Sequence, residues 1–114
     1  MQGHCNIQFV IEGNGDVYPC DFYCLDEYLL GNIHTATFAE LASSAAAKAF
    51  LANPCGDDGR CRDCAYTKYC CNGCRRYRDG DAYRYCEASR KFYAEFVERL
   101  PEIDQMLMSG TVKF

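Results

Sequence analysis

The residues of this sequence best suited to chemistry are its cysteines, and one short stretch holds them at spacings typical of metal ligation. They follow the pattern Cys61-x2-Cys64-x5-Cys70-x3-Cys74, with Cys86 twelve residues further on. Thiolates bind soft metals, and both zinc sites and iron–sulfur clusters use them. The first pair would suit zinc, but the wider x5 and x3 loops favour a bulkier group such as a [4Fe–4S] cluster. A structural zinc-binding adaptor module remains the alternative.

The sequence also predicts a reducing compartment for these thiols. The first five residues lack the basic and apolar segments of a signal peptide, and no apolar run approaches the roughly 18 residues of a membrane span. We therefore expect a cytoplasmic protein without membrane contact, in which metal is favoured over disulfides. A disulfide-stapled binding domain is the third possibility, and it requires the chain to be part of a longer secreted protein.

Length and charge exclude further classes. The chain has 114 residues, which suits one domain over 1–114 and is too short for a barrel enzyme with its own cofactor cradle. Twelve Lys and Arg against sixteen Asp and Glu give a net charge of −4, so nucleic acid is not expected as a partner. The local cluster Arg75, Arg76 and Arg78 is interpreted as solvated surface.

The sequence patterns around the cysteines predict a small α+β fold that is organised by a metal ion or an iron–sulfur cluster. Asn14-Gly15 lies between two apolar runs, which predicts an N-terminal β-hairpin ending at Pro19. Residues 21–33 are interpreted as a loop with a helical turn and a break at Gly31-Asn32. Cys5 and Cys20 should therefore lie near the open end of the hairpin.

The helices are expected after this loop. Thr37-x-x-Glu40 has the pattern of a capping box, and the alanine-rich run that follows predicts one central helix from Thr37 to Leu51. The stretch from Cys55 to Tyr85 has little apolar periodicity, so ligation rather than packing should order its irregular loops. From Cys86 onward a helix is predicted to end at Leu100-Pro101, followed by a short last helix over 102–108.

Two earlier cysteines extend the pattern over most of the chain. Cys5, Gly15 and Cys20 follow as Cys-x9-Gly-x4-Cys, ahead of the five cysteines above. This order of seven cysteines and one glycine resembles the signature of the SPASM domain, the C-terminal auxiliary-cluster domain of certain radical-SAM enzymes. Gly15 to Tyr23 and Leu30 to Ile33 look like one branch of them, the anaerobic sulfatase-maturating enzymes, including arylsulfatase regulators.

The resemblance implies a cofactor and a reaction. Those enzymes oxidise a Cys or Ser of an unfolded sulfatase to formylglycine, and this domain holds two [4Fe–4S] clusters. Carried over by position, a first cluster would use Cys5, Cys20 and Cys74, and a second cluster would use Cys61, Cys64, Cys70 and Cys86. The first cluster is one ligand short, because the family places that cysteine a few residues before the position of Cys5. In an aerobically prepared sample zinc is a possible substitute.

The resemblance also implies missing parts. The radical-SAM cluster needs Cys-x3-Cys-x2-Cys, and no three of the ten cysteines have that spacing. We therefore expect a C-terminal piece of a longer enzyme, inactive alone, in which S-adenosylmethionine binds only to the missing barrel domain. The expected partners are that barrel, within the same full-length chain, and the unfolded sulfatase peptide.

Asp21 is the candidate for catalysis. Oxidation of an alcohol or thiol to an aldehyde needs a base near an electron acceptor, and Asp21 follows the expected ligand Cys20 directly. The matching aspartate of the family is its proposed base. The alternative is a turn residue that accepts backbone N–H bonds.

The remaining candidates have smaller expected roles. Cys24 and Cys71 are interpreted as small buried hydrophobes, whereas Cys55 and His4 are possible substitute ligands. Five tyrosines are expected to shield the cysteine loops, namely Tyr66, Tyr69, Tyr77, Tyr83 and Tyr85.

Overall fold

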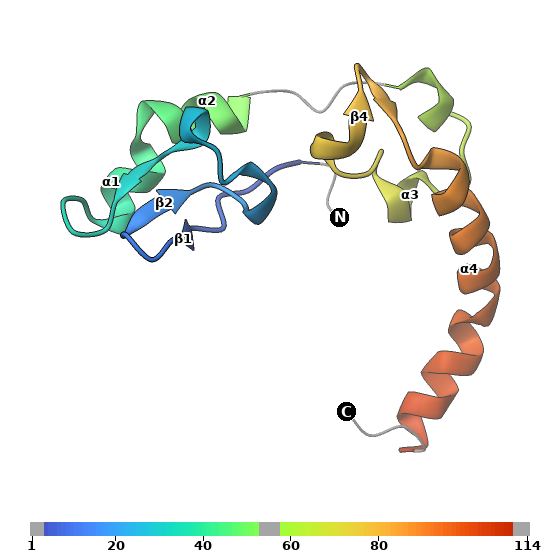
Figure 1. Cartoon of the computed structure of the whole chain (residues 1–114). Coiled ribbons are helices and arrows are strands. Elements are labelled where there is room, and N and C mark those ends of the chain that lie inside the picture. The colour runs from blue at the N-terminus through green and yellow to red at the C-terminus, as the bar shows by residue number, and fades with distance from the viewer. Residues whose placement is uncertain (1–3, 53–57, 111–114) are drawn as a thin grey trace. The chain divides into compact units, whose positions relative to one another are not determined.

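The N-terminal hairpin is present at the predicted position. The structure, a computed structural model, describes residues 4–52 and 58–110. Strand β1 (Val10–Ile11) pairs antiparallel with β2 (Asp16–Tyr18), with Ile11 opposite Val17. Gly15 closes the turn at a φ of 88°, and its N–H donates to the Glu12 carbonyl at 2.9 Å. The hairpin expected from Asn14-Gly15 is therefore confirmed (Figure 1).

The chain divides into two compact units, Gln2–Gly56 and Asp57–Phe114. Each unit has its own elements, and the expected small α+β fold with a hairpin, few helices and cysteine-rich loops is confirmed. The single domain over 1–114 stays a prediction, since two compact units can belong to one domain.

The predicted break at Gly31-Asn32 is wrong, because these residues form strand β3. This strand pairs antiparallel with β2, and Gly31 lies opposite Val17. Gly31 has a φ of 143°, and a Cβ on it would lie 2.7 Å from the Leu41 side chain. A glycine that would ordinarily interrupt a strand is thus required here for close packing on Leu41.

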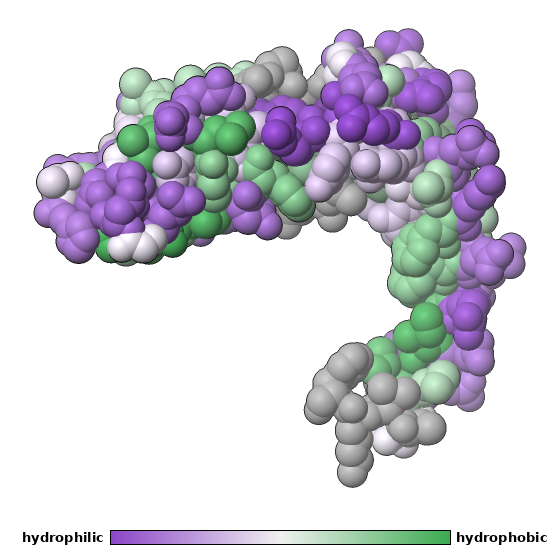
Figure 2. Space-filling model, in the orientation of Figure 1, coloured by the Kyte–Doolittle hydropathy of each residue, from purple (hydrophilic) through white to green (hydrophobic). Residues whose placement is uncertain are grey.

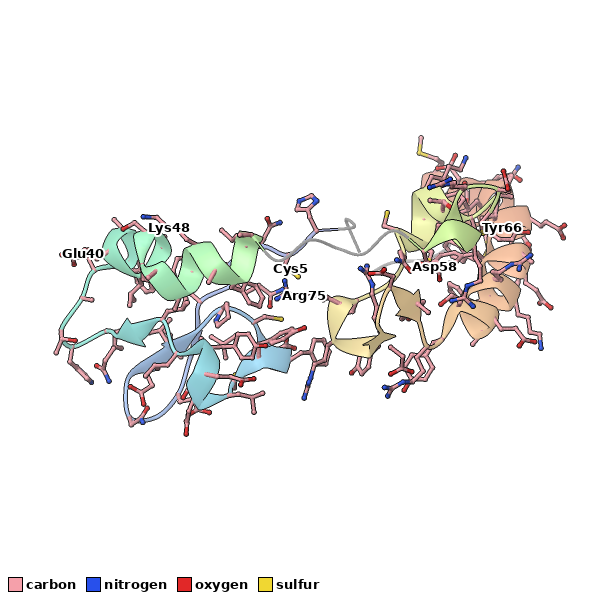
Figure 3. All side chains as sticks on the ribbon, turned by 90° about the horizontal axis from the view of Figure 1, so that it is seen from above. Cys5, Glu40, Lys48, Asp58, Tyr66 and Arg75 are labelled. Atoms are coloured by element: carbon pink, nitrogen blue, oxygen red, sulfur yellow. The ribbon has the colours of Figure 1, made fainter. Side chains whose placement is uncertain are left out.

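The capping box at Thr37 is confirmed. The Thr37 hydroxyl accepts from the Glu40 N–H at 3.3 Å, and the Thr37 N–H donates to the Glu40 carboxylate at 2.8 Å. These bonds satisfy the exposed N–H groups of the first turn and start helix α1 (Phe38–Ser43). Glu40 lies at this end of the helix in Figure 3.

The single helix predicted over Thr37 to Leu51 is divided in two. Ser44 has a ψ of 157°, and a second helix, α2 (Ala45–Ala52), begins after it. The Ser44 hydroxyl accepts from the Ala47 N–H at 3.1 Å, so it acts as a new N-terminal cap. Helix propensity alone predicted continuity, and the serine's bond to the following turn explains the break.

The first unit has a hydrophobic core between its sheet and helices. Val17, Leu30, Leu41 and Ala47 are buried together. The loop after β2 contains two 3-10 turns, η1 (Asp21–Tyr23) and η2 (Asp26–Tyr28). Their tyrosines surround Phe50 of α2, with ring centroids 5.2 and 6.1 Å from it. Packing therefore anchors the loop that carries Asp21.

The second unit consists of short elements and one long helix. Its elements are η3 (Gly59–Cys61), α3 (Thr67–Cys70), η4 (Arg75–Tyr77), the antiparallel pair β4 (Arg78–Asp79) and β5 (Ala82–Tyr83), and α4 (Cys86–Met108). Among residues 58–110 the only buried hydrophobic side chain is Tyr83, which is 8% exposed. This part of the chain thus has almost no apolar core.

Helix α4 is continuous, so the predicted end at Leu100-Pro101 and the separate helix over 102–108 are wrong. Pro101 lies inside the helix, where it removes one backbone hydrogen bond. One side of α4 is apolar and the other hydrophilic (Figure 2), in agreement with the predicted amphipathic pattern. None of the helices within residues 4–52 and 58–110 is long and apolar enough to cross a membrane.

Candidate metal centre

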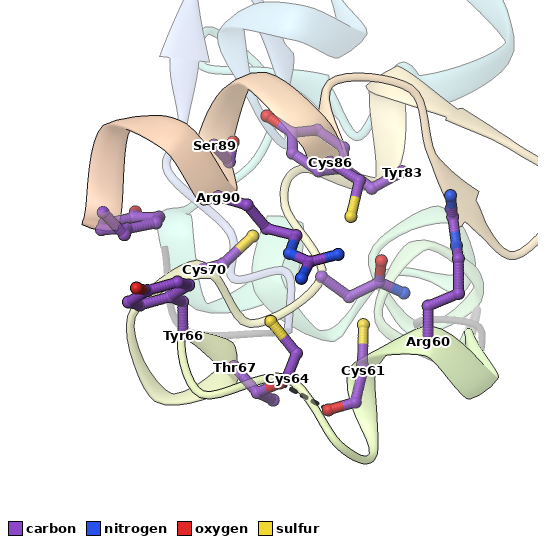
Figure 4. A pocket seen from close by; sticks show the side chains of 12 residues that line it. Arg60, Cys61, Cys64, Tyr66, Thr67, Cys70, Tyr83, Cys86, Ser89 and Arg90 are labelled. Carbon is purple, nitrogen blue, oxygen red and sulfur yellow. Dashed lines mark hydrogen bonds between the residues drawn. The ribbon is translucent and has the colours of Figure 1, made fainter. Parts of the chain in front are cut away.

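Four cysteines of the second unit line one pocket. They are the four assigned by position to the second cluster, namely Cys61, Cys64, Cys70 and Cys86. They come from η3, the following loop, the end of α3 and the start of α4 (Figure 4). The pocket has about 340 Å³ of space not filled by protein atoms, part of it open to solvent. The structure thus brings the predicted set together, while its role in ligation stays a prediction.

Local hydrogen bonds shape the loop between the first two cysteines. The Cys64 N–H donates to the Cys61 carbonyl at 3.4 Å, and the Thr67 hydroxyl donates to the same carbonyl at 2.5 Å. The Thr67 N–H donates to the Cys64 carbonyl at 3.1 Å and leads into α3. The Cys-x2-Cys spacing therefore forms a tight turn with both side chains on the pocket wall.

A left-handed turn follows Cys70. The φ angles are positive at three successive residues, with 49° at Cys71, 57° at Asn72 and 61° at Gly73. Residues other than glycine and asparagine seldom adopt such a backbone conformation. The side chain of Arg78 holds this turn, since its Nε and Nη2 donate to the carbonyls of Asn72 and Gly73 at 2.9 and 3.1 Å. The Gly73 N–H donates to the Cys70 carbonyl at 2.9 Å and closes the turn.

Gly73 is predicted to be required for this turn. A Cβ at Gly73 would lie 2.4 Å from the ring of Tyr83, which lines the pocket. Gly73→Ala should cost roughly 1–2 kcal/mol for the left-handed backbone and a further roughly 1–3 kcal/mol for crowding of the ring. Denaturant unfolding of the metal-loaded chain measures the sum.

Gly80 is the matched control for this prediction. It also has a φ of 61°, but a Cβ there would meet nothing within 4 Å. Gly80→Ala should therefore show only the backbone cost. Equal destabilisation by both variants would mean that the contact with Tyr83 contributes nothing.

Burial and mutual repulsion act on the thiols of the pocket. Burial raises the pKa of Cys61, and the negative charges of Asp58, Cys86, Cys70 and Cys64 raise it further. Burial also raises the pKa of Cys70, against the lowering effect of the N–H groups of Gly73 and Asn72. Ligation must therefore displace protons, and bound cationic iron or zinc would relieve the repulsion between thiolates.

The rest of the pocket wall is aromatic, polar or basic. Of the five tyrosines expected to shield the cysteine loops, Tyr66 and Tyr83 line the pocket, and the other three do not. Tyr93, which was not singled out, lines it as well. The two arginines of the wall, Arg60 and Arg90, were not singled out from the sequence. Arg90 lies four residues after Cys86, so helical periodicity was the signal available for it.

The chemistry of these donors fits an iron–sulfur cluster. The pocket wall offers four thiols and no carboxylate. Soft sulfur donors suit iron–sulfur clusters and zinc, and they disfavour hard cations. Within residues 4–52 and 58–110 no three His, Cys, Asp or Glu side chains are arranged to hold a single metal ion, so the structure shows a shared pocket for the four thiols and not a formed metal-ion site.

The other predicted set is divided between the two units. Cys5 and Cys20 belong to the first unit and Cys74 to the second. The Gln8 N–H donates to the Pro19 carbonyl at 2.7 Å, so both cysteines of the first unit continue from the same open end of the hairpin, as expected. Cys74 precedes η4 and is not part of the pocket wall described above.

Asp21 begins η1 directly after Cys20. Its Oδ1 accepts from the Cys20 thiol and from the Phe22 N–H, both at 3.1 Å. The contacts agree with both expected roles of Asp21. The carboxylate touches the predicted ligand Cys20, as a catalytic base near a cluster would, and it accepts a backbone N–H, as a turn residue would. Its other oxygen, Oδ2, accepts no hydrogen bond within the described residues.

The remaining cysteines are less buried than expected. Cys24 and Cys71 are half-buried, and their thiols contact the carbonyls of Cys20 at 3.6 Å and Lys68 at 3.7 Å. The prediction that they are small buried hydrophobes is wrong in this respect, because each reaches a carbonyl at the surface of its turn. His4 is exposed, and Cys55 lies outside the described residues.

Comparison with known proteins identifies the class. The family model SPASM, an iron-sulfur cluster-binding domain, matches residues 5–65, more than half of the chain. The chain belongs to this family. The match includes Cys5, Cys20, Cys61 and Cys64 and ends before the later cysteines.

Within this family, the chain is similar to proteins described as anaerobic sulfatase-maturating enzymes. The chain is similar to the cysteine-type anaerobic sulfatase-maturating enzyme of Clostridium novyi (strain NT), with 36% identity over 94% of this chain and 30% of the relative. The enzyme of the same description from Clostridium perfringens (strain 13 / Type A) is 38% identical over 88% of this chain and 29% of the relative. A serine-type enzyme of Bacteroides thetaiotaomicron is 48% identical over 39% of this chain and 11% of the relative.

Solved structures agree in fold. Native anSMEcpe with bound AdoMet and Kp18Cys peptide has a TM-score of 0.80 and 36% identity, over 90% of this chain and 30% of that chain. Native anSMEcpe with bound AdoMet and Cp18Cys peptide has a TM-score of 0.82 and 34% identity, over 94% and 31%. The chain thus spans about 30% of the length of the relatives that it matches over most of its own length.

Proposed function

We propose that this chain is the auxiliary-cluster domain of a cytoplasmic radical-SAM enzyme that oxidises a sulfatase Cys or Ser to formylglycine. The observation that carries the proposal is the convergence of Cys61, Cys64, Cys70 and Cys86 on one pocket in a domain of the SPASM family. Relatives described as sulfatase-maturating enzymes, three times longer than this chain, support the reaction and the missing barrel.

Two groups of residues would hold the clusters. The pocket cysteines would hold the second, whereas Cys5, Cys20 and Cys74 would hold the first together with a ligand from elsewhere. Bound clusters would accept the electron released by substrate oxidation and pass it on. S-adenosylmethionine would bind to the barrel, because this sequence lacks Cys-x3-Cys-x2-Cys.

Asp21 would take up the substrate proton. The oxidation removes a hydrogen atom, a proton and an electron from the side chain of the peptide, and a carboxylate beside Cys20 is placed for the proton. In the ligating state Cys20 has no thiol proton to donate. Its bond to Asp21 Oδ1 is then lost, so that Oδ1 keeps only the Phe22 N–H and the carboxylate can accept the substrate's proton.

The proposal predicts one firmly held cluster in the isolated 114-residue chain. Anaerobic reconstitution should yield about four iron atoms per chain rather than about eight, with a broad visible absorption in the blue. The physical reason is that the pocket holds a complete set of four thiols, whereas the first set lacks a ligand. Iron and sulfide analysis together with the visible spectrum measures this.

Two cysteine variants give the matched comparison. Cys86→Ala should abolish the tightly bound iron, whereas Cys20→Ala should leave it unchanged. A colourless zinc protein would instead support the structural zinc module, and a metal-free protein without free thiols would support the disulfide-stapled domain. About eight tightly bound irons would mean that Cys24, Cys55, His4 or an added ligand completes the first cluster.

A further inference from the structure

Helix α4 supplies more to the pocket than one cysteine. Cys86, Ser89, Arg90 and Tyr93 all line it, at the spacing of one helix face. In Figure 4 the guanidinium of Arg90 extends into the space between the sulfur atoms. The first two turns of α4 thus combine a thiol and a cationic side chain at one site.

Among the residues that the structure describes, Arg90 is the one positively charged side chain of this pocket wall that no carboxylate neutralises. Besides the cysteines, the charged side chains of the pocket wall are Arg60 and Arg90. Arg60 is bonded to Asp58 through its Nε at 3.0 and 2.9 Å and its Nη2 at 2.5 Å. The same bonds hold the pKa of Asp58 below its usual range, so the pair contributes no net charge.

Arg90 differs from Arg60 in its contacts. Within residues 58–110 it makes no hydrogen bond or ion pair to another side chain or carbonyl. A guanidinium that is directed into a pocket of four thiols and has no carboxylate partner is available to the anionic sulfur atoms. An arginine presents several N–H donors in a planar arrangement, so one side chain can contact more than one sulfur.

The positive charge of Arg90 would act on the negative charge of a metal–thiolate assembly in the pocket. Four thiolates around a metal or an iron–sulfur core form an assembly of net negative charge, and reduction adds another negative charge. A nearby cation stabilises this assembly, and it stabilises the reduced form more than the oxidised form. Removal of the cation should therefore lower the reduction potential and weaken metal binding.

We propose that Arg90 is a positioning residue of the four-cysteine pocket, where its guanidinium compensates the charge of the metal–thiolate assembly and raises its reduction potential. The cluster part of this inference rests on the proposed function, because it requires an iron–sulfur cluster in the pocket. The charge compensation itself applies to any metal that the four thiolates bind.

The test compares three variants of the 114-residue chain with the wild type after anaerobic reconstitution. Arg90→Gln should shift the midpoint potential to a more negative value and accelerate loss of iron to a chelator. Arg90→Lys keeps the charge and should restore part of the shift. Arg84→Gln is the control, because Arg84 pairs with Asp79 at 2.8 Å on the β4–β5 hairpin, and the variant removes the same charge outside the pocket.

A titration of the metal-free chain with Co²⁺ provides the second measurement. The thiolate absorption bands of bound Co²⁺ should show an affinity about tenfold or more lower for Arg90→Gln than for the wild type, as expected for a residue that supports metal ligands. Arg84→Gln should bind Co²⁺ like the wild type.

The outcomes separate this inference from the proposed function. If the wild type takes up no iron, the proposed function fails, and the Co²⁺ titration then decides on Arg90 alone. An unchanged midpoint potential in iron-loaded Arg90→Gln would overturn the inference and leave the proposed function intact. Equal Co²⁺ affinities of Arg90→Gln and the wild type, or no Co²⁺ binding by either, would overturn it as well.

Discussion

In the full-length enzyme proposed above, Asp21→Asn is expected to lower the rate of formylglycine formation by roughly a hundredfold or more, the usual cost of losing a general base. Asparagine keeps the size of the side chain but removes its basicity. Cleavage of S-adenosylmethionine and both clusters should survive, so the loss should appear in product formation alone. Separate assays of formylglycine, 5′-deoxyadenosine and iron measure these quantities.

Asp26 offers the matched control for Asp21. It begins η2 as Asp21 begins η1, and both are exposed, but it follows Leu25 instead of a cysteine. Asp26→Asn should leave the rate unchanged. A wild-type rate for Asp21→Asn would return Asp21 to the role of a turn residue that accepts the Phe22 N–H. Loss of the first cluster would instead assign Asp21 to the support of Cys20.

Removal of one pocket thiol should have the largest effect on structure. Cys64→Ala, or removal of the metal by a chelator, should abolish the bound iron and loosen residues 58–85. The first unit should remain folded, because its core of Val17, Leu30, Leu41 and Ala47 contains none of the pocket ligands. In residues 58–110 Tyr83 alone is a buried hydrophobic side chain, so metal–thiolate bonds must supply most of the folding free energy there.

Hydrogen exchange and limited proteolysis resolve the two regions. Protection should fall over residues 58–85 and persist in the hairpin and in α1 and α2. Cys71→Ala is the control, since Cys71 lies next to Cys70 but does not line the pocket. Unchanged protease resistance over 58–85 after complete removal of metal would contradict the prediction that ligation orders this region.

The local features of the first unit were readable from the sequence. The turn at Asn14-Gly15 and the capping box of Thr37 and Glu40 involve bonds between residues two to four positions apart, so neighbouring residue types suffice to predict them. The strand at Gly31 was missed because its reason is the distant side chain of Leu41, which fills the space that a Cβ would take.

The helix ends show the same limit of local reasoning. Propensity predicted one helix through Ser44 and a break at Pro101. In the structure the helix breaks at Ser44, and α4 continues through Pro101. At Ser44 a side-chain bond to the Ala47 N–H competes with helical continuity. At Pro101 the lost hydrogen bond is a cost that an otherwise continuous helix of 23 residues tolerates.

The sequence by itself, through its resemblance to the SPASM signature, predicted that Cys61, Cys64, Cys70 and Cys86 lie together, and the structure gathers these four around one pocket. Their role as ligands, and the grouping of Cys5, Cys20 and Cys74, stay predictions. The sequence could not reveal the left-handed turn at Cys71 to Gly73, which depends on the ring of Tyr83 and the clamp by Arg78. Nor could it distinguish Arg90 from Arg60, since the difference is the contact of Arg60 with Asp58. Tertiary structure decided these points, because charge and space at a site depend on which side chains meet there.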